Sequence, residues 1–120
     1  MARYKVDITG INTSEIKVLT NEEMTQLFVR LKNGDIDAKT ELINGNLKLV
    51  LSILKNFNRS DINMDDLFQV GVIGLIKAID NFDLSYGLKL STYAVPLIVG
   101  EIKRFIRDNT QLRVSRSIKD

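Results

Sequence analysis

The sequence contains no cysteine, no histidine and no tryptophan, and it has a single proline among its 120 residues. Without cysteine there is no disulfide, no thiol nucleophile and no metal site built on thiolates. Without histidine the commonest general base of enzymes is also missing. The carboxylates are scattered and form no evident nucleophile–base pair or metal cluster. We therefore expect no enzyme, no metal site and no cofactor.

The chain also lacks long apolar runs. No stretch approaches the roughly 18–20 apolar residues that span a bilayer, and the first residues, MARYKVDITG, lack the apolar part of a secretory signal. The composition is 44% hydrophobic and 27% charged, which is ordinary for a globular domain. The lack of cysteine agrees with a reducing compartment without proving it. We expect one cytoplasmic domain with no membrane partner.

Charge is distributed unevenly along the chain. Residues 61–83 hold five acidic residues and one lysine, whereas residues 84–120 hold seven basic and three acidic residues. Such segregation indicates two surfaces for two kinds of partner. The alternative is that solvated charges are scattered by chance, and charge alone does not decide between the two.

Apolar residues recur at helical spacing along most of the chain and show no alternation typical of strands. This pattern predicts an all-α fold, a small helical bundle of about four helices. Residues 1–19 show no sustained period and predict an irregular N-terminal arm. The expected helices cover residues 20–33, 36–58, 64–82 and 91–108.

Local signals mark the ends of these helices. Thr20 or Asn21 can cap the first helix, Asp35 opens the second, Asn63 can cap the third and Ser91 the last. The second helix contains the interruption Asn-Gly-Asn at 44–46. We expect it to continue through this point, because its apolar stripe resumes in phase and one glycine costs only about 1 kcal/mol.

The last helix has two different sides when it is drawn at about 100° per residue. Its inward side is apolar, and its outward side combines an aromatic ring with three cations. Bases stack on rings and phosphates pair with cations, so this side suits a single strand of nucleic acid. For this helix taken alone, a solvated face with a scattered tyrosine is the simpler explanation. The outward residues are Tyr93, Pro96, Leu97, Gly100, Lys103, Arg104 and Arg107.

The third helix is apolar nearly all round. Seven of its positions could pack inward, among them Val70, Gly71 and Gly74, and the two glycines permit another helix to approach closely. Phe68, Val72 and Ile76 point elsewhere. A second apolar side beside acidic residues predicts a docking surface for a protein. The alternative is a central helix that is simply wrapped by the others.

Several stretches resemble the bacterial sigma-70 family, whose members give RNA polymerase its promoter specificity. DDLFQVGVIGLIKAIDNFD at 65–83 and LKLSTYA at 88–94 are similar to region 2 of that family. NGNLKLVLSILKNF at 44–57 is similar to its region 2.1, and residues 21–43 to its region 1.2. STYAVPLIVGEIKRFIRDN and RVSRSIKD resemble the sporulation branch, its sigma-G group first and its sigma-F group second.

The resemblance implies a protein partner for the third helix. In the family, region 2.2 docks on the clamp coiled coil of the β′ subunit of core RNA polymerase. An anti-sigma factor, which competes for this surface, is a second expected partner, and the chain could alternatively act as the interaction module that such an inhibitor targets. The matching residues are Asp65, Asp66, Gln69, Val70, Gly71, Val72 and Ile76.

The resemblance also implies a DNA partner, the −10 promoter element on its non-template strand, bound through regions 2.3 and 2.4. Tyr93 matches the tyrosine on which a flipped base stacks, and Arg107 would contact phosphate. Leucine at 88 and 90, and Pro-Leu at 96–97, stand where housekeeping members have aromatics, so strong unaided melting of duplex DNA is not expected. The matching residues are Lys89, Ser91, Thr92, Tyr93, Pro96, Gly100, Lys103, Arg104 and Arg107.

On this resemblance the chain divides into an arm at 1–19, a helical domain of regions 1.2 to 2.4 at 20–110, and the start of a truncated region 3 at 111–120. We expect the N-terminal part of a sporulation sigma factor that acts in the forespore cytoplasm. Family members read the −35 element with a further domain, so this part alone is not expected to direct ordinary promoter-specific initiation.

Overall fold

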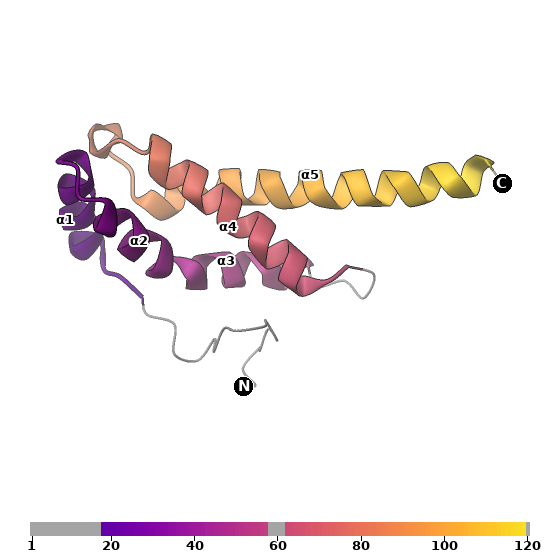
Figure 1. Cartoon of the computed structure of the whole chain (residues 1–120), viewed down its shortest axis with the longest axis horizontal. Helices are drawn as coiled ribbons and strands as arrows, with labels where there is room; N and C mark the ends of the chain where they lie inside the picture. Colours follow the sequence, from indigo (N-terminus) through magenta and orange to yellow (C-terminus); the bar gives the residue numbers. More distant parts are fainter. Residues whose placement is uncertain (1–17, 58–61, 120) are drawn as a thin grey trace.

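A computed structural model describes residues 18–57 and 62–119, and the side chains of these residues as far as 109. Every regular element within those ranges is a helix, which confirms the all-α fold (Figure 1). Residues 1–17 of the predicted arm lie outside the described part. The elements are α1 (Asn21–Lys32), α2 (Ile36–Asn44), α3 (Leu47–Leu54), the 3₁₀ turn η2 (Lys55–Phe57), α4 (Met64–Asn81), the 3₁₀ turn η3 (Leu84–Tyr86) and α5 (Leu90–Lys119).

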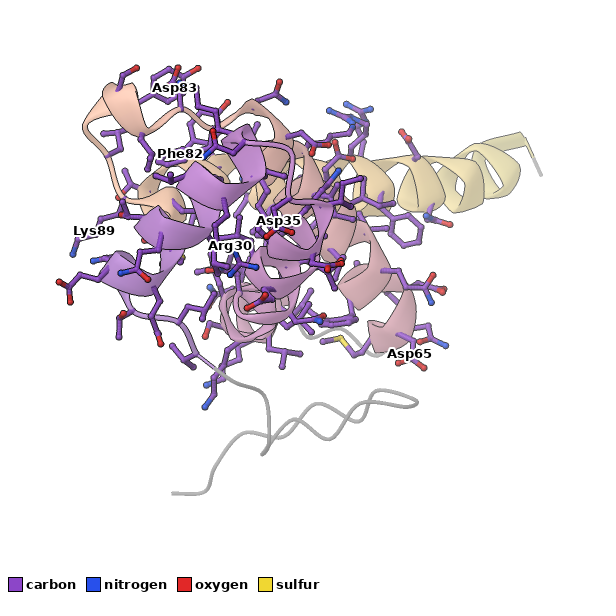
Figure 2. The ribbon with its side chains drawn as sticks, turned by 60° about the vertical axis from the view of Figure 1, so that its left-hand side comes forward. Arg30, Asp35, Asp65, Phe82, Asp83 and Lys89 are labelled. Carbon is purple, nitrogen blue, oxygen red and sulfur yellow. The ribbon has the colours of Figure 1, made fainter. Side chains whose placement is uncertain are left out.

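The junction of α1 and α2 follows the local signals closely. Thr20 and Glu23 form a reciprocal cap, in which the Glu23 backbone N–H donates to the Thr20 hydroxyl (3.1 Å) and the Thr20 N–H to the Glu23 carboxylate (2.8 Å). Gly34, at φ 96°, turns the chain between the helices. Asp35 caps α2 and pairs with Arg30 at 2.9 Å, and this pairing lowers the pKa of Asp35 (Figure 2).

The second predicted helix is wrong as a single element, because the chain breaks between α2 and α3. The buried amide of Asn46 donates to the Leu42 carbonyl at 2.8 Å and lies 3.4 Å from the Met24 sulfur. Asn46 thus supplies a hydrogen bond to a carbonyl near the end of α2, and its contact with Met24 holds the break against α1. The Leu19 side chain packs so closely against Gly45 that a Cβ at this position would force it to move. The apolar stripe does resume in α3, but on a separate helix.

Helix α4 is the centre of the fold and packs against α2, α3 and α5. At Gly74 its backbone meets that of α5, where an added Cβ would lie 2.8 Å from the Ile98 Cα and 3.0 Å from the Leu97 carbonyl oxygen. At Gly71 an added Cβ would lie 2.6 Å from a methyl group of Val50 on α3. The prediction that these glycines permit close helix packing is therefore confirmed.

The buried side of α4 is wider than the sequence suggested. Phe68, predicted to point away from the core, is buried within it. On the same side of the helix, Leu75 follows Phe68 by two turns and Ile79 by three turns, and both are fully buried. Three partner helices cover a broader arc of α4 than one partner could. The prediction divided α4 into one inward and one outward side, and for this reason it misplaced Phe68.

Helix α5 begins at Leu90 and not after a Ser91 cap. The Tyr93 N–H donates to the carbonyl of Lys89 (3.3 Å), so Lys89 holds the capping position and Ser91 lies inside the first turn. The helix continues through Pro96 and across residue 110, and its C-terminal part extends past the other helices (Figure 1). The domain limit at 110 stays a prediction. Within the part of the chain that the structure describes, no helix has the length and apolarity to cross a membrane.

Two glycine substitutions test the crossing of α4 and α5. Gly74→Ala should destabilise the fold by about 1–3 kcal/mol, because its methyl group meets backbone that cannot move aside cheaply. Gly100→Ala is the matched control: an added Cβ at Gly100 has nothing within 4 Å. This control should raise the stability of the fold by up to about 1 kcal/mol, because alanine favours a helix more than glycine does. Urea unfolding followed by circular dichroism measures both, and equal stabilities would contradict the crossing geometry.

Candidate functional surfaces

The side of α4 that faces away from the core carries a stripe at i, i+3, i+4 and i+7, which we call the α4 outer face: Gln69, Val72, Ile73 and Ile76. Ile73 is 48% exposed, unusually open for a large apolar side chain in a central helix. Gln69 is exposed, whereas Val72 and Ile76 are half-buried, and Val72 also packs against the core. The sequence prediction omitted Ile73, although the same helical spacing could have found it.

The remaining predicted docking residues are divided by the fold. Asp65 and Asp66 lie in the first turn of α4, where the Asn63 side chain accepts from the Asp65 N–H at 2.7 Å. Val70 is half-buried and packs on the core. Gly71 is buried against α3, where it serves the packing of α4, and its predicted contact with a partner stays a prediction.

The outward side of α5, which we call the α5 outer face, is mostly open. Its residues are Thr92, Tyr93, Pro96, Gly100, Lys103, Arg104 and Arg107, and all except the half-buried Tyr93 and Gly100 are exposed. Lys89 is exposed just before the helix, on the opposite side of the molecule from Asp65 (Figure 2). Two predicted residues do not belong to this face. Leu97, predicted to point outward, packs against the core, and Ser91, predicted to contact DNA, is half-buried on the side of the helix that carries Ile98 and Ile102.

Four rings meet where α1, α4, η3 and α5 come together, and we call them the ring cluster: Phe28, Phe82, Tyr86 and Tyr93. Phe82 is its centre, with ring centroids 5.0 Å from Phe28, 5.9 Å from Tyr86 and 5.5 Å from Tyr93. Tyr86 and Tyr93 are 5.6 Å apart. The cluster fixes the position of Tyr93 and leaves it half-buried, so its ring is held in place and only part of it is available to a ligand.

Tyr86 is a candidate residue that sequence reasoning missed. It is 50% exposed beside Tyr93, and its hydroxyl donates to the Asn81 carbonyl at 3.3 Å. A hollow of about 300 Å³ opens beside the cluster, with Phe82, Leu88 and Lys89 in its lining. The only sequence signal was an aromatic residue in a short loop next to Tyr93, and the loop conformation that brings the two rings together was not predictable from spacing.

The three cations of the α5 outer face differ in their partners. Arg107 lies 3.2 Å from Asp108, and Arg104 lies 3.3 Å from both carboxylate oxygens of Glu101. Lys103 forms no ion pair with any residue that the structure describes. Pairs between exposed side chains are weak and are screened by salt, so these cations stay available to an anionic ligand.

Glu101 joins the two helices electrostatically. Its carboxylate accepts from the Lys77 ammonium of α4 at 2.7 Å, and its side chain is only 16% exposed. The hydrogen bond with Lys77 is the main cause that lowers the pKa of Glu101, and Arg104 adds to it. Glu101 therefore remains charged at neutral pH. No group of His, Cys, Asp or Glu in the described part of the chain could hold a metal ion.

Comparison with known proteins places these surfaces in a family. The model of sigma-70 region 2 matches residues 42–111, which contain both outer faces and three members of the ring cluster. The chain belongs to the sigma-70 family. This result confirms the resemblance that the sequence motifs carried.

The sigma-G relatives are more similar than the sigma-F relatives, as expected. The RNA polymerase sigma-G factor of Bacillus subtilis (strain 168) is 58% identical over the whole of this chain, and that of Clostridium acetobutylicum 57%. A sigma-F factor of B. subtilis is 48% identical over 85% of the chain. A Bacillus thuringiensis protein, provisionally named a sigma-G factor, is matched over 96% of its length, but the chain spans only 46% and 47% of the first two relatives.

The charge of Glu101 provides a test of this junction. Lys77→Met should raise the pKa of Glu101 toward its ordinary value, because the largest stabilising contact of the carboxylate is lost. Arg104→Met, the control, should raise it less. The pKa of Glu101 is lower in the folded protein than in the unfolded chain. Glu101 therefore stabilises the fold at any pH above its unfolded pKa, and this stabilisation is lost as the pH falls through its folded pKa. Carboxyl-carbon NMR titration measures the pKa, and no change in Lys77→Met would contradict the assignment.

Proposed function

We propose that this chain is the part of a sporulation sigma factor that binds core RNA polymerase through α4 and the −10 promoter element through α5. In this role it helps to direct transcription of forespore genes, in the forespore cytoplasm. The observation that carries the proposal is the opposite chemistry of two outer faces on adjacent helices, one apolar and one cationic with an ordered ring. Both faces lie within the segment that matches sigma-70 region 2.

The α4 outer face suits a helical protein partner. An exposed isoleucine between half-buried aliphatic side chains can fill a groove between two helices. Gln69 offers a polar contact beside it, and Asp65 and Asp66 place negative charge at the start of the helix. On this proposal the partner is the clamp coiled coil of the polymerase β′ subunit, and the apolar anchor at Ile73 supplies much of the affinity.

The α5 outer face suits an unpaired DNA strand. A base that is flipped out loses the stacking of its neighbours. The half-buried ring of Tyr93 can replace part of that stacking. Lys89 can neutralise a phosphate near that base, and Lys103 and Arg107, about three and four turns further along α5, can neutralise phosphates farther along the strand. Gly100 has open space where a side chain would stand, so a base edge or the backbone of the strand can come close to the helix.

The ring cluster is proposed to make base capture less costly. Tyr93 is already held by Phe82 and Tyr86, so little side-chain freedom remains to be lost when a base stacks on it. Thr92 lies beside Tyr93 in the sequence and Arg104 lies about three turns further along the same face, and both can contact sugar, phosphate or base edge. Pro96 adds a rigid apolar step in the next turn of the helix.

An anti-sigma factor is proposed as a second partner, because an inhibitor that covered the α4 outer face would exclude polymerase. The exposure of Ile73 favours this possibility, since an uncovered apolar side chain is a natural target for any protein partner. This partner would compete with polymerase and not with DNA, so substitutions on α5 should leave its binding intact.

Tyr93→Ala should weaken binding to a single-stranded −10 oligonucleotide by about 1–3 kcal/mol, because the stacking surface is lost. Tyr93→Phe, which keeps the ring, is the control and should bind nearly as well as the wild type. Fluorescence anisotropy gives the affinities, and circular dichroism checks that both variants are folded. An affinity that survives Tyr93→Ala in a folded protein would rule out the stacking role.

Ile73→Asp should abolish co-purification with core RNA polymerase, because it puts a charge in the middle of the apolar α4 outer face. Ile36→Asp makes the same change at a residue of α2 that is 75% exposed, and it should have no effect. Lys103→Ala should also co-purify normally. Equal retention of the Ile73 and Ile36 variants on immobilised polymerase would show that α4 is not the docking surface.

A further inference from the structure

Lys77, Glu101 and Arg104 form a chain of charges between the two outer faces. Lys77 is the only base in residues 61–83, and it follows Ile73 by one turn along the edge of the α4 outer face. Arg104 belongs to the α5 outer face. Glu101 lies between them and contacts both, at 2.7 Å and 3.3 Å respectively.

The two contacts of Glu101 are unequal. The Lys77 ammonium is at the short end of charge-assisted hydrogen bonds, whereas the Arg104 guanidinium is beyond their usual range. Glu101 is mostly covered, while the other two side chains are more than half exposed. The carboxylate is therefore fixed chiefly by Lys77, and the arginine is free to turn toward a ligand.

A carboxylate on a face that binds phosphate is normally a disadvantage. It repels the ligand directly, and it competes with phosphate for the neighbouring arginine. At Glu101 these costs are reduced, because Lys77 balances the negative charge from the side of α4. The lysine thereby affects the α5 outer face without belonging to it.

We propose that Lys77 is a positioning residue for DNA binding: by holding the Glu101 carboxylate, it keeps Arg104 available to a DNA phosphate. This inference rests on the proposed function of the α5 outer face. When Lys77 is removed, Glu101 closes on Arg104 and leaves an unbalanced negative charge beside the strand. Any acidic group of a protein partner that captured Lys77 on α4 would have the same effect, so occupancy of one face would alter the affinity of the other.

The test compares five variants for binding a fluorescent single-stranded −10 oligonucleotide at low salt: Lys77→Met, Lys77→Arg, Lys39→Met, Glu101→Gln and the double variant of Lys77→Met with Glu101→Gln. Lys77→Met should weaken binding about two- to fivefold more than Lys39→Met does. Lys39 is the matched control, because it also makes a 2.7 Å ion pair with a carboxylate of another helix, Asp80, and loses the same charge. Adding Glu101→Gln to Lys77→Met should restore the affinity, and Lys77→Arg should retain it.

A purely structural ion pair would behave differently. Lys77→Met and Glu101→Gln would then weaken oligonucleotide binding by similar factors, and the double variant would bind no better than Lys77→Met. That result, or equal affinities of Lys77→Met and Lys39→Met, would overturn the inference.

A second measurement needs no DNA and separates this inference from the proposed function. In the free protein, the side-chain ¹⁵Nε–H signal of Arg104 should shift and exchange more slowly in Lys77→Met, because Glu101 then pairs with it more closely. An unchanged signal would overturn the inference whether or not the oligonucleotide binds. If the wild-type protein does not bind the oligonucleotide, the DNA role of α5 is refuted. If the Arg104 signal nevertheless shifts in Lys77→Met, the charge coupling stands.

Discussion

The close crossing of α4 and α5 is the constraint on which the other features depend. At Gly74 the absence of a side chain lets the α5 backbone approach so closely that a methyl group would overlap Ile98. This proximity meshes the apolar sides of both helices and brings Lys77 within hydrogen-bonding distance of Glu101. It also requires each helix to turn its remaining side outward. The two outer faces are thus consequences of one packing contact.

The turn that joins these helices has a separate effect on the site. It carries the chain from the end of α4 through η3 to the start of α5, and it gathers Phe82, Tyr86 and Tyr93 into one cluster. A tyrosine on an isolated helix face would have to be ordered by its ligand. Here the protein core has already ordered the ring, which favours the capture of an unpaired base over non-specific attraction of DNA by charge alone.

The sequence predicted most features that depend on neighbouring residues, with the Ser91 cap as an exception, and missed those that depend on distant ones. The caps at Thr20, Asp35 and Asn63 use side chains within three positions of the bond that they satisfy, and all three are present. The break after α2 depends on packing against α1 and the segment before it, which no periodicity reveals. For the same reason the side of α4 to which Phe68 belongs, and the pairing of Tyr86 with Tyr93, could not be read from spacing.

The separation of the two faces can be measured directly by NMR with the ¹⁵N-labelled chain. One titration uses a single-stranded −10 oligonucleotide, and the other uses a peptide of the clamp coiled coil of RNA polymerase. We predict that the oligonucleotide shifts signals of the α5 outer face, the peptide shifts those of the α4 outer face, and both ligands bind at once. Shifts from both ligands in one shared set of residues, or mutual exclusion of the two, would contradict a protein with two separate binding faces.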